Sequence, residues 1–209
     1  MMTDMYSRQQ ELGLNVPDSV TVVGCGGVGS WVATMLAMSG VPKLYLFDPD
    51  ALEPTNFNRL PLPPVKSGTN KARALREWLI TLRPGAMIAA NGSRADGVVM
   101  AKTEALFDCT DDFTVREPLY VWCQENRVRY IRAGYDGGNH VTVAHSLPWQ
   151  AGTPLARYDV VPSWVVPAIM VAALAVWECL MSLNVNGNRS LSLDIEALVQ
   201  AAHEVSSGK

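Results

Sequence analysis

A glycine-rich stretch near the start of the chain has the residue types that cradle a phosphate group. Residues 22–30 are Val-Val-Gly-Cys-Gly-Gly-Val-Gly-Ser, so valines lead into a run of glycines as a buried strand would. In such a loop Gly24 permits a tight turn, Gly26 lets the backbone approach phosphate, and Gly29 lets the next helix pack closely on the strand. The candidate phosphate-binding residues are Gly24, Gly26, Gly27 and Gly29. The sequence therefore predicts a nucleotide site in which the phosphates face this loop.

A carboxylate follows the loop at a spacing that suits a ribose. Asp48 lies 24 residues after Gly24, at the end of the next expected strand. In an open α/β sheet this position places a carboxylate where it accepts hydrogen bonds from ribose hydroxyl groups. A dinucleotide such as NAD and an adenine mononucleotide both satisfy this pattern, so Asp48 alone leaves the nucleotide open.

Two cations and a further carboxylate fit a triphosphate better than a nicotinamide dinucleotide. Arg59 offers a forked set of donors and Lys71 offers a point charge, and both residue types bind phosphate oxygens. Asp111, at the end of a later strand, suits Mg²⁺ because this hard cation takes carboxylates together with phosphate oxygens. A hydride-transferring enzyme has no evident use for these three groups. They favour ATP and Mg²⁺ as the cofactors.

The segments that must position these residues alternate between strand and helix. Apolar or alternating runs predict strands at 19–24, 43–47, 86–90, 105–109, 128–133, 141–144 and 191–193. Helices are expected at 28–39, from the N-cap Asn70 through Leu82, at 114–126, over an apolar stretch ending near 183, and at the polar C-terminus. Prolines and glycines predict loops at 51–68 and 148–162 and a turn at 137–138. This alternation predicts an α/β, Rossmann-like, doubly wound fold with a mostly parallel sheet, flanking helices, and a C-terminal crossover loop followed by the apolar helix.

Length and composition limit the class of protein. The chain has 209 residues, of which 48% are hydrophobic and 18% charged, as in a globular protein with a sizeable core. We expect a single domain over residues 1–209. The formal net charge is −3 and the pI is about 5.6, which argues against nucleic acid as a partner.

The cysteines and the first residues favour a cytoplasmic protein. The four cysteines are Cys25, Cys109, Cys123 and Cys179, and no two of them form a Cys-x-x-Cys pair. This pattern argues against a zinc ribbon and predicts reduced thiols, the last three as packing residues. His140 and His145 lack cysteine or aspartate partners at metal-ligand spacing. The first residues do not combine a basic start with an apolar run, as a signal peptide would.

Residues 160–183 are apolar enough to require comparison with a membrane span. The stretch is about as long as a helix that crosses a bilayer. However, Pro162, Ser163, Pro167 and Glu178 interrupt it, and no basic cluster flanks it. Since a charged side chain is costly in lipid, we expect a helix of the core or of a subunit interface, and no membrane partner.

In their order along the chain these motifs resemble those of the ThiF/MoeB family, the adenylating domain shared with ubiquitin-activating enzymes. The matching parts are Arg8-Gln9, the glycine loop, Gly40, the segment 48–59 with its D-x-D and N-x-N-R motifs, Lys71, the segment Asp108-Cys109-Thr110-Asp111-Asp112, and the late apolar helix after a proline-rich loop. The resemblance covers nearly the whole chain. It implies an ATP- and Mg²⁺-dependent adenylyltransferase that activates the C-terminal carboxylate of a small ubiquitin-like or sulfur-carrier protein ending in Gly-Gly. It also implies a homodimer.

The resemblance assigns roles to several residues. Asp48 would hold the ribose, and Asn56 would lie beside the phosphates. Arg8 would reach across the dimer into the partner's site. Asp50 would either contribute to nucleotide binding or shape its turn.

Each charged candidate also has a structural interpretation. Arg59 and Arg8 could be solvated side chains, and Lys71 could be an exposed lysine on a helix surface. Asp111 could cap the helix that begins near residue 113, although Asp112 fits that role better.

The sequence departs from the family pattern at three points. It lacks the two Cys-x-x-Cys pairs that commonly hold structural zinc, and its crossover loop at 146–154 has no cysteine. Asp112 stands where Asn is usual, and Leu60 where Gln is frequent. The missing cysteines predict a minimal domain that stops at the acyl-adenylate or passes it to another protein. Trp149 and Trp164, which flank the loop, would cover either a bound partner tail or ordinary core surface.

Three other functions remain as alternatives. The missing zinc and cysteine elements also fit a non-catalytic partner subunit that binds a carrier or completes a heterodimer. The glycine loop with Asp48 would suit an NAD-dependent oxidoreductase. Activation of a group on tRNA is disfavoured by the acidic pI.

Overall fold

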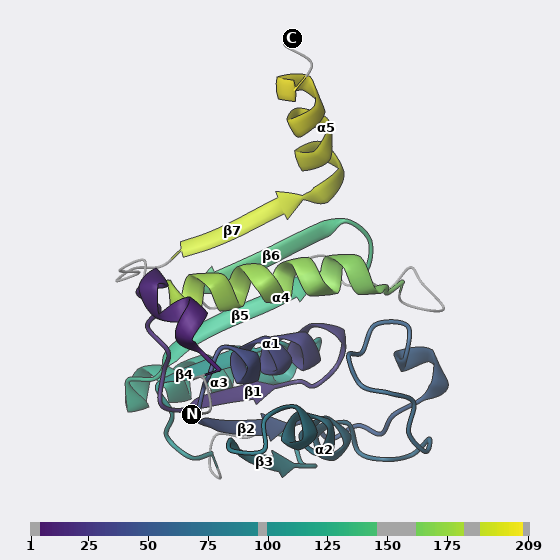
Figure 1. The fold of residues 1–209 in the computed structure, drawn as a ribbon. Helices are drawn as coiled ribbons and strands as arrows, with labels where there is room; N and C mark the ends of the chain where they lie inside the picture. Colours follow the sequence, from purple (N-terminus) through teal and green to yellow (C-terminus); the bar gives the residue numbers. More distant parts are fainter. Residues whose placement is uncertain (1–4, 96–99, 146–161, 182–188, 207–209) are drawn as a thin grey trace.

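The strands form one seven-stranded sheet in a computed structural model that describes residues 5–95, 100–145, 162–181 and 189–206 (Figure 1). The strands are β1 (Val20–Val23), β2 (Lys43–Phe47), β3 (Met87–Asn91), β4 (Ala105–Asp108), β5 (Arg129–Tyr135), β6 (His140–His145) and β7 (Arg189–Asp194). Every residue of β1 and β4 is buried, because these two strands lie inside the sheet and both of its faces are covered there.

The order of the strands shows where a ligand can bind. Along the sheet the order is β3-β2-β1-β4-β5-β6-β7. The first five of these strands are parallel, and β6 and β7 are added antiparallel, so the predicted mostly parallel sheet is confirmed. The chain runs outward from β1 to β3 and then returns to β4 on the other side of β1. Ligands of open α/β sheets bind outside the carboxyl ends of the strands at such a reversal.

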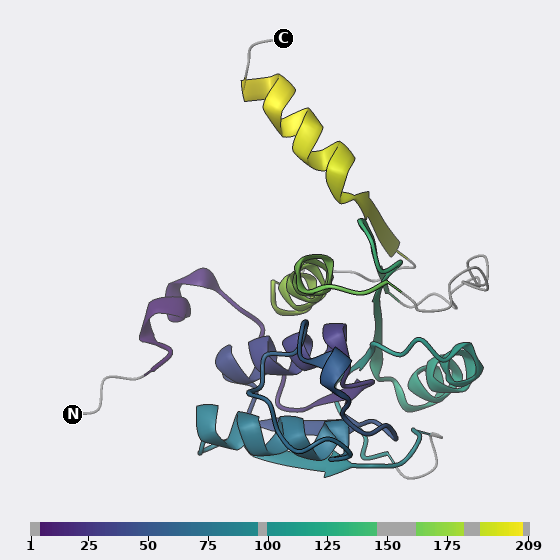
Figure 2. The same ribbon diagram turned by 90° about the vertical axis from the view of Figure 1, so that its right-hand side faces the viewer.

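Helices cover both faces of the sheet, as the doubly wound prediction requires (Figure 2). Three of them, α1 (Gly27–Met38), α2 (Lys71–Leu82) and α4 (Val165–Leu180), lie on one face, and α3 (Phe113–Asn126) lies on the other. The first face is buried by a large apolar cluster to which β1, β2, α1, α2 and α4 contribute. A smaller cluster, which includes Leu106 and Leu119, fills the space under α3.

Two side-chain caps explain where two helices begin. Asn70 precedes α2 and accepts a hydrogen bond from the Arg73 amide at 3.1 Å, as predicted. Asp112 precedes α3 and accepts from the Thr114 amide at 2.9 Å, which confirms it as the cap instead of Asp111. Such caps satisfy amide groups that have no partner within the helix.

The boundaries of some other elements differ from the prediction because of tertiary contacts. β5 continues past residue 133 to Tyr135 because it pairs with β6 as far as Tyr135 opposite Val141. Two short 3-10 helices, η1 (Ser7–Leu12) and η2 (Pro54–Asn56), were not predicted. The predicted loop at 148–162, with Trp149, lies almost wholly outside the described residues.

The apolar stretch forms the core helix α4. Its buried residues, among them Val171 and Ala175, join the large apolar cluster. Glu178, the charge that interrupts the stretch, pairs with His145 of β6. No helix in the described parts of the chain is both long and apolar enough to cross a membrane. Cys179 on α4 and Cys123 on α3 are buried in the two clusters, which confirms them as packing residues.

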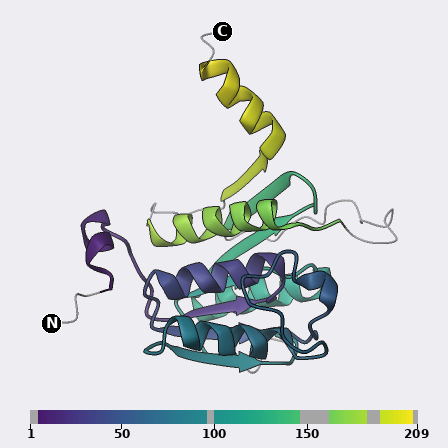
Figure 3. The same ribbon diagram turned by 45° about the vertical axis from the view of Figure 1, so that its right-hand side comes forward.

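The two ends of the described chain lie away from the reversal point. The 3-10 helix η1 lies on the side of the molecule opposite the loop at 51–70 (Figure 3). At the other end, β7 leads into α5 (Ile195–Ser206), which stands clear of the sheet (Figures 1 and 2). The Leu198 side chain on α5 is 47% exposed.

Candidate functional site

Two glycines of the loop at the end of β1 occupy positions that cannot hold a side chain. Gly24 has a φ of +85°, and a Cβ there would lie 2.8 Å from the carbonyl oxygen of Cys109. A Cβ at Gly29 would lie only 1.7 Å from the carbonyl oxygen of Gly24. These distances confirm that the close turn and the close packing of α1 both depend on glycine.

Gly26 differs from its neighbours because the space beside it is open. A Cβ at Gly26 would meet no atom within 4 Å. Gly26 is the N-cap of α1 and makes no side-chain cap, so the first amide groups of the helix face this opening. A helix N-terminus with free amides is a favourable place for a phosphate. Gly26 therefore leaves room for a ligand group to approach the backbone.

Asp48 holds the glycine loop against the end of β2. Its carboxylate accepts hydrogen bonds from the amides of Cys25 at 2.6 Å and Asp50 at 2.8 Å. Asp48 is only 4% exposed, and this burial raises the pKa of its carboxyl group, although the two amide hydrogen bonds oppose the rise. A carboxylate has about four lone-pair positions, so two of them remain for a ribose hydroxyl group.

Lys71 and Asp50 form an ion pair beside Asp48. The Lys71 Nζ atom lies 2.9 Å from the Asp50 Oδ2 atom, and the Lys71 amide donates to the Asp50 carbonyl oxygen at 2.9 Å. The Lys71 side chain is only 16% exposed, unlike a solvated lysine on a helix surface. Asp50 thus has a structural role in this turn, because it fixes both ends of Lys71.

Arg59 reaches the glycine loop from the segment after η2. The Arg59 Cδ atom would lie 3.1 Å from a Cβ at Gly27, so the arginine side chain passes over the start of α1. Its Nη1 atom donates to the Thr55 carbonyl oxygen and to Asn58 Oδ1, each at 2.9 Å. The Trp31 indole donates to the Arg59 carbonyl oxygen at 3.0 Å. These contacts hold the guanidinium group at the predicted phosphate loop.

The side chain of Asn56 is used within its own turn. Asn56 is buried, and its Oδ1 atom accepts a hydrogen bond from the Glu53 amide at 3.1 Å. This contact shapes the 3-10 turn that precedes Arg59. The expected place of Asn56 beside a phosphate stays a prediction.

Asp111 follows β4 on the other side of the reversal point. It is exposed, and Thr110 beside it contacts the glycine loop, since a Cβ at Gly24 would lie 3.0 Å from the Thr110 amide nitrogen. The structure therefore brings the loop, the two cations and Asp111 to one edge of the sheet. Among the described residues no three potential ligands cluster as a ready-made metal site. A single exposed carboxylate fits Mg²⁺, which completes its shell with water and nucleotide phosphates.

The chain is similar to known proteins in sequence and in fold. The sequence model of the ThiF family matches residues 7–185. The chain belongs to the ThiF family. In sequence this ThiF-family adenylation domain is 34% identical to ubiquitin-like modifier-activating enzyme 5 of Caenorhabditis elegans over 131 residues, which are 56% of this chain and 31% of that protein. The enzyme of the same name from Drosophila persimilis is 31% identical over 132 residues, 56% of this chain and 34% of that protein. The chain thus spans about a third of the length of these relatives.

Solved structures show the same fold. The structure of E. coli MccB with ATP has a TM-score of 0.73 at 19% identity, and the match covers 93% of this chain and 72% of that chain. The structure of PaaA has a TM-score of 0.66 at 17% identity, with 85% and 64% of the two chains covered. At these identities the likeness establishes the fold of the ThiF-family domain.

A buried polar network beneath Asp111 was not predicted. The Asp108 carboxylate, which is fully buried, accepts hydrogen bonds from the Tyr130 hydroxyl at 2.6 Å and from Arg132 Nη1 at 3.2 Å. Burial and the neighbouring Asp108 charge raise the pKa of Tyr130 well above its usual value, so Tyr130 remains a donor. Burial and the positive charge of Arg132 lower the pKa of Arg116 to about 10. Arg132, a charged residue within a predicted strand, was the sequence signal for this network.

Arg8 does not lie at the site of its own chain. It is exposed on η1, which is attached to the C-terminal end of α1, where Gln9 Nε2 donates to the Ser39 carbonyl oxygen at 2.8 Å. The Tyr6 ring packs on Gly40 at the same end. The glycine loop is at the opposite end of α1, and a helix of 12 residues is about 18 Å long.

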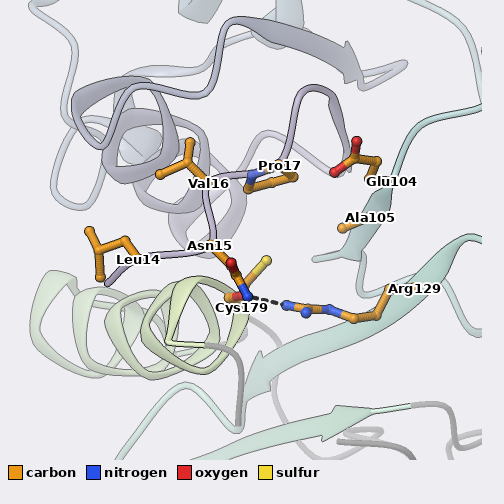
Figure 4. Close-up of a pocket in the computed structure, with 8 residues that line it drawn as sticks. All are labelled: Leu14, Asn15, Val16, Pro17, Glu104, Ala105, Arg129 and Cys179. Atoms are coloured by element: carbon orange, nitrogen blue, oxygen red, sulfur yellow. Dashed lines mark hydrogen bonds between the residues drawn. The ribbon is translucent and has the colours of Figure 1, made fainter. Parts of the chain in front are cut away.

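A cavity of about 510 Å³ lies at the amino edge of the sheet, away from the residues described above (Figure 4). It is lined by Leu14, Asn15, Val16, Pro17, Glu104, Ala105, Arg129 and Cys179. Arg129 Nη2 donates to the Cys179 carbonyl oxygen there at 2.8 Å. Because ligands of this fold class bind at the carboxyl edge, we assign the functional site to the glycine loop and not to this cavity.

Proposed function

We propose that this domain binds ATP with Mg²⁺ and adenylates the C-terminal carboxylate of a small ubiquitin-like or sulfur-carrier protein that ends in Gly-Gly. The observation that carries the proposal is the position of Arg59. Its side chain passes over Gly27 at the opening of the glycine loop, where a hydride-transfer enzyme would have no need of a guanidinium group. Lys71, the first residue of α2, and Asp111, after the end of β4, support the same assignment.

The reaction explains why cations are needed and a strong base is not. An oxygen of the carrier carboxylate forms a bond to the α-phosphorus of ATP, and the bond from that phosphorus to the bridging oxygen breaks, so pyrophosphate leaves. The nucleophile is already an anion, and the barrier arises from bringing negative groups together and from charge on the leaving phosphates. Arg59 and Lys71 offset this charge. Mg²⁺ held by Asp111 would neutralise phosphate charge in the same way.

The remaining residues position the nucleotide. Asp48 has acceptor capacity left for the ribose after it binds the Cys25 and Asp50 amides. Gly26 leaves room for a phosphate against the first amides of α1. The turn around Asn56 sets the path of the chain toward Arg59. We propose Asn56 and Asp50 as further nucleotide-site residues, Asp50 through its contact with Lys71.

Arg8 can take part only if two copies associate. Its segment is attached to the far end of α1, so its own glycine loop is out of reach. We propose a homodimer in which Arg8 of one copy enters the site of the other. Exposed apolar side chains on α1 and α4, including Met38 at 49% and Trp177 at 53%, offer surface for such an association.

The names of the relatives support the substrate class. Ubiquitin-like modifier-activating enzyme 5 is named for a ubiquitin-like modifier, and MccB has been solved with MccA. The crossover loop at 146–154 has no cysteine, so we propose that the acyl-adenylate passes to another protein. We propose a cytoplasmic location from the unpaired, reduced cysteines.

The decisive experiment is ATP–pyrophosphate exchange dependent on a candidate carrier ending in Gly-Gly. Arg59→Ala should lower the exchange rate about 100-fold or more, as expected when a group that stabilises transition-state charge is removed. Arg73→Ala is the matched control, because Arg73 is an exposed arginine near the start of α2. Full exchange by Arg59→Ala or Asp111→Ala would overturn the assignment of the site.

A non-catalytic partner subunit is the second candidate, favoured by the absence of cysteine from the crossover loop. A chain that fails to bind ATP in the presence of Mg²⁺ would fit that function. Tight binding of NADH without binding of ATP would instead indicate an oxidoreductase.

A further inference from the structure

The buried network at the ends of β4 and β5 surrounds a single turn residue, Thr110. We infer that Arg132, acting with Asp108, is a positioning residue that fixes the Thr110–Asp111 turn and so sets the Mg²⁺ affinity of Asp111. The inference rests on the proposed function for its Mg²⁺ readout, but the geometry of the turn is independent of it.

Arg132 joins two segments that are far apart in the sequence. Its Nη1 atom lies 2.7 Å from the Thr110 carbonyl oxygen, 3.1 Å from the Asp108 carbonyl oxygen and 3.2 Å from Asp108 Oδ1. One side chain from β5 therefore contacts both the last residue of β4 and the turn that follows it. Arg132 is 5% exposed, so water does not compete for these acceptors.

Every polar atom of Thr110 is held by this network. The Asp108 Oδ1 atom accepts from the Thr110 amide at 3.0 Å and from its hydroxyl group at 2.8 Å. The Thr110 carbonyl oxygen accepts from Arg132 and also from Arg116 Nη2 at 3.2 Å. Because the backbone of Thr110 is fixed on both sides, the next residue, Asp111, leaves the network in one direction and remains exposed.

The chemistry of the network suits it to positioning the Thr110–Asp111 turn more than to stabilising the fold. The free energy needed to remove an arginine and an aspartate from water offsets much of their electrostatic attraction. A buried pair is therefore a weak source of stability. The three contacts of Arg132 with the carbonyl oxygens of Asp108 and Thr110 and with Asp108 Oδ1 are made by one guanidinium nitrogen, Nη1. A lysine ammonium group is a flexible point charge and lacks the rigid planar group that holds this nitrogen in place. In metal sites the residues behind the ligands commonly change metal affinity when they are altered.

The first test is the Mg²⁺ dependence of ATP–pyrophosphate exchange in full-length Arg132→Lys and Arg132→Met. We expect the Mg²⁺ concentration for half-maximal exchange to rise about tenfold in both variants, with the KM for ATP at saturating Mg²⁺ little changed. Arg129→Lys and Arg129→Met are matched controls, because Arg129 is on the same strand but bonds to Cys179 at the amino edge. A wild-type Mg²⁺ midpoint in both Arg132 variants would overturn the inference.

The second test needs no substrate and separates this inference from the proposed function. Amide hydrogen exchange of peptides covering residues 108–112, followed by mass spectrometry, should be faster in Arg132→Lys and in Thr110→Val than in the wild type and in Arg129→Lys. If the wild type shows no ATP–pyrophosphate exchange, the proposed function fails while this readout still tests the role of Arg132. Unchanged protection of 108–112 in Arg132→Lys and Thr110→Val would show that the network does not hold the turn.

Discussion

The two halves of the candidate site are built by opposite means. In the half at the ends of β1 and β2, the backbone at Gly24 and Gly29 packs so closely against carbonyl oxygens that a side chain would clash. The half at the ends of β4 and β5 consists of buried charges that must be paired, with Asp108 bonded to Arg132 and Tyr130. Adding atoms should therefore damage the first half, and removing charges should damage the second.

Because the two halves are built differently, they can bind different kinds of ligand. Backbone amides at the start of α1 can bind any phosphate group that reaches them. A carboxylate held by a buried network presents a defined oxygen ligand for a cation. We therefore propose that the first half binds the nucleotide and the second half places the metal ion, and each role can be tested by substitution.

The largest effect is expected for Asp108→Asn. The substitution removes the negative charge while Arg132 stays buried beside it, so an uncompensated charge remains in the core. We expect a loss of about 3–5 kcal/mol in the free energy of unfolding, measured by urea denaturation. Asp111→Asn, at the exposed position three residues later, should change stability by no more than about 0.5 kcal/mol. Equal stability of Asp108→Asn and wild type would contradict the role given to the buried pair.

The next largest loss of stability is expected at Gly29, in contrast to Gly26 of the same loop. Gly29→Ala places a Cβ 1.7 Å from the Gly24 carbonyl oxygen and should lower stability by about 3 kcal/mol, through overpacking against backbone. Gly26→Ala meets no neighbour, so its stability should stay within about 1 kcal/mol of the wild type while its affinity for ATP falls. Thermal unfolding and ATP titration of both variants measure the contrast. Similar stability losses for the two would show that the loop is more adaptable than these distances indicate.

A smaller effect is expected at the cap of α3. Asp112→Ala should lower the free energy of unfolding at pH 7 by about 1 kcal/mol. Asp112→Asn keeps a hydrogen-bond acceptor, so it should lower the free energy of unfolding by less. Hydrogen bonds from Thr114, first its hydroxyl and then its amide, lower the pKa of Asp112. A lowered pKa means that the stabilisation is present above the unfolded value of about 3.9 and is lost as the pH falls through the folded value. The gap between wild type and Asp112→Ala should therefore narrow below about pH 4, and a gap independent of pH would argue against the charged cap.

The smallest expected change in the free energy of unfolding is at Asp48, and its dependence on pH is opposite to that of Asp112. Burial raises the pKa of Asp48, so its contribution to stability is greatest below the unfolded value of about 3.9 and is lost as the pH rises through the folded value. Asp48→Asn cannot ionise, so relative to the wild type it should gain stability between about pH 4 and pH 7. Urea denaturation across this range measures the change, with Asp111→Asn as the exposed control. A wild-type advantage that grows with pH would show that the Cys25 and Asp50 amides outweigh the effect of burial.

Local sequence was sufficient for one half of the site and insufficient for the other. The glycine loop, the strand before it and the N-cap Asn70 all depend on residues close together in the chain, and each was predicted. The Asp108–Arg132 pair joins residues 24 positions apart, and it forms only because β4 and β5 are neighbours in the sheet. No periodicity or spacing indicates such a contact. The place of Arg8 at the far end of α1 likewise follows from tertiary packing, through Gln9 and Ser39.

The position of α5 has a practical consequence for protein engineering. β7 is four strands away from β1 in the sheet, about 19 Å at the usual spacing, and α5 extends further from it. A fusion partner joined after Asp194, in place of α5, would therefore be attached about 19 Å along the sheet from β1. The end of β7 is a suitable place for an affinity tag, a fluorophore or a surface anchor.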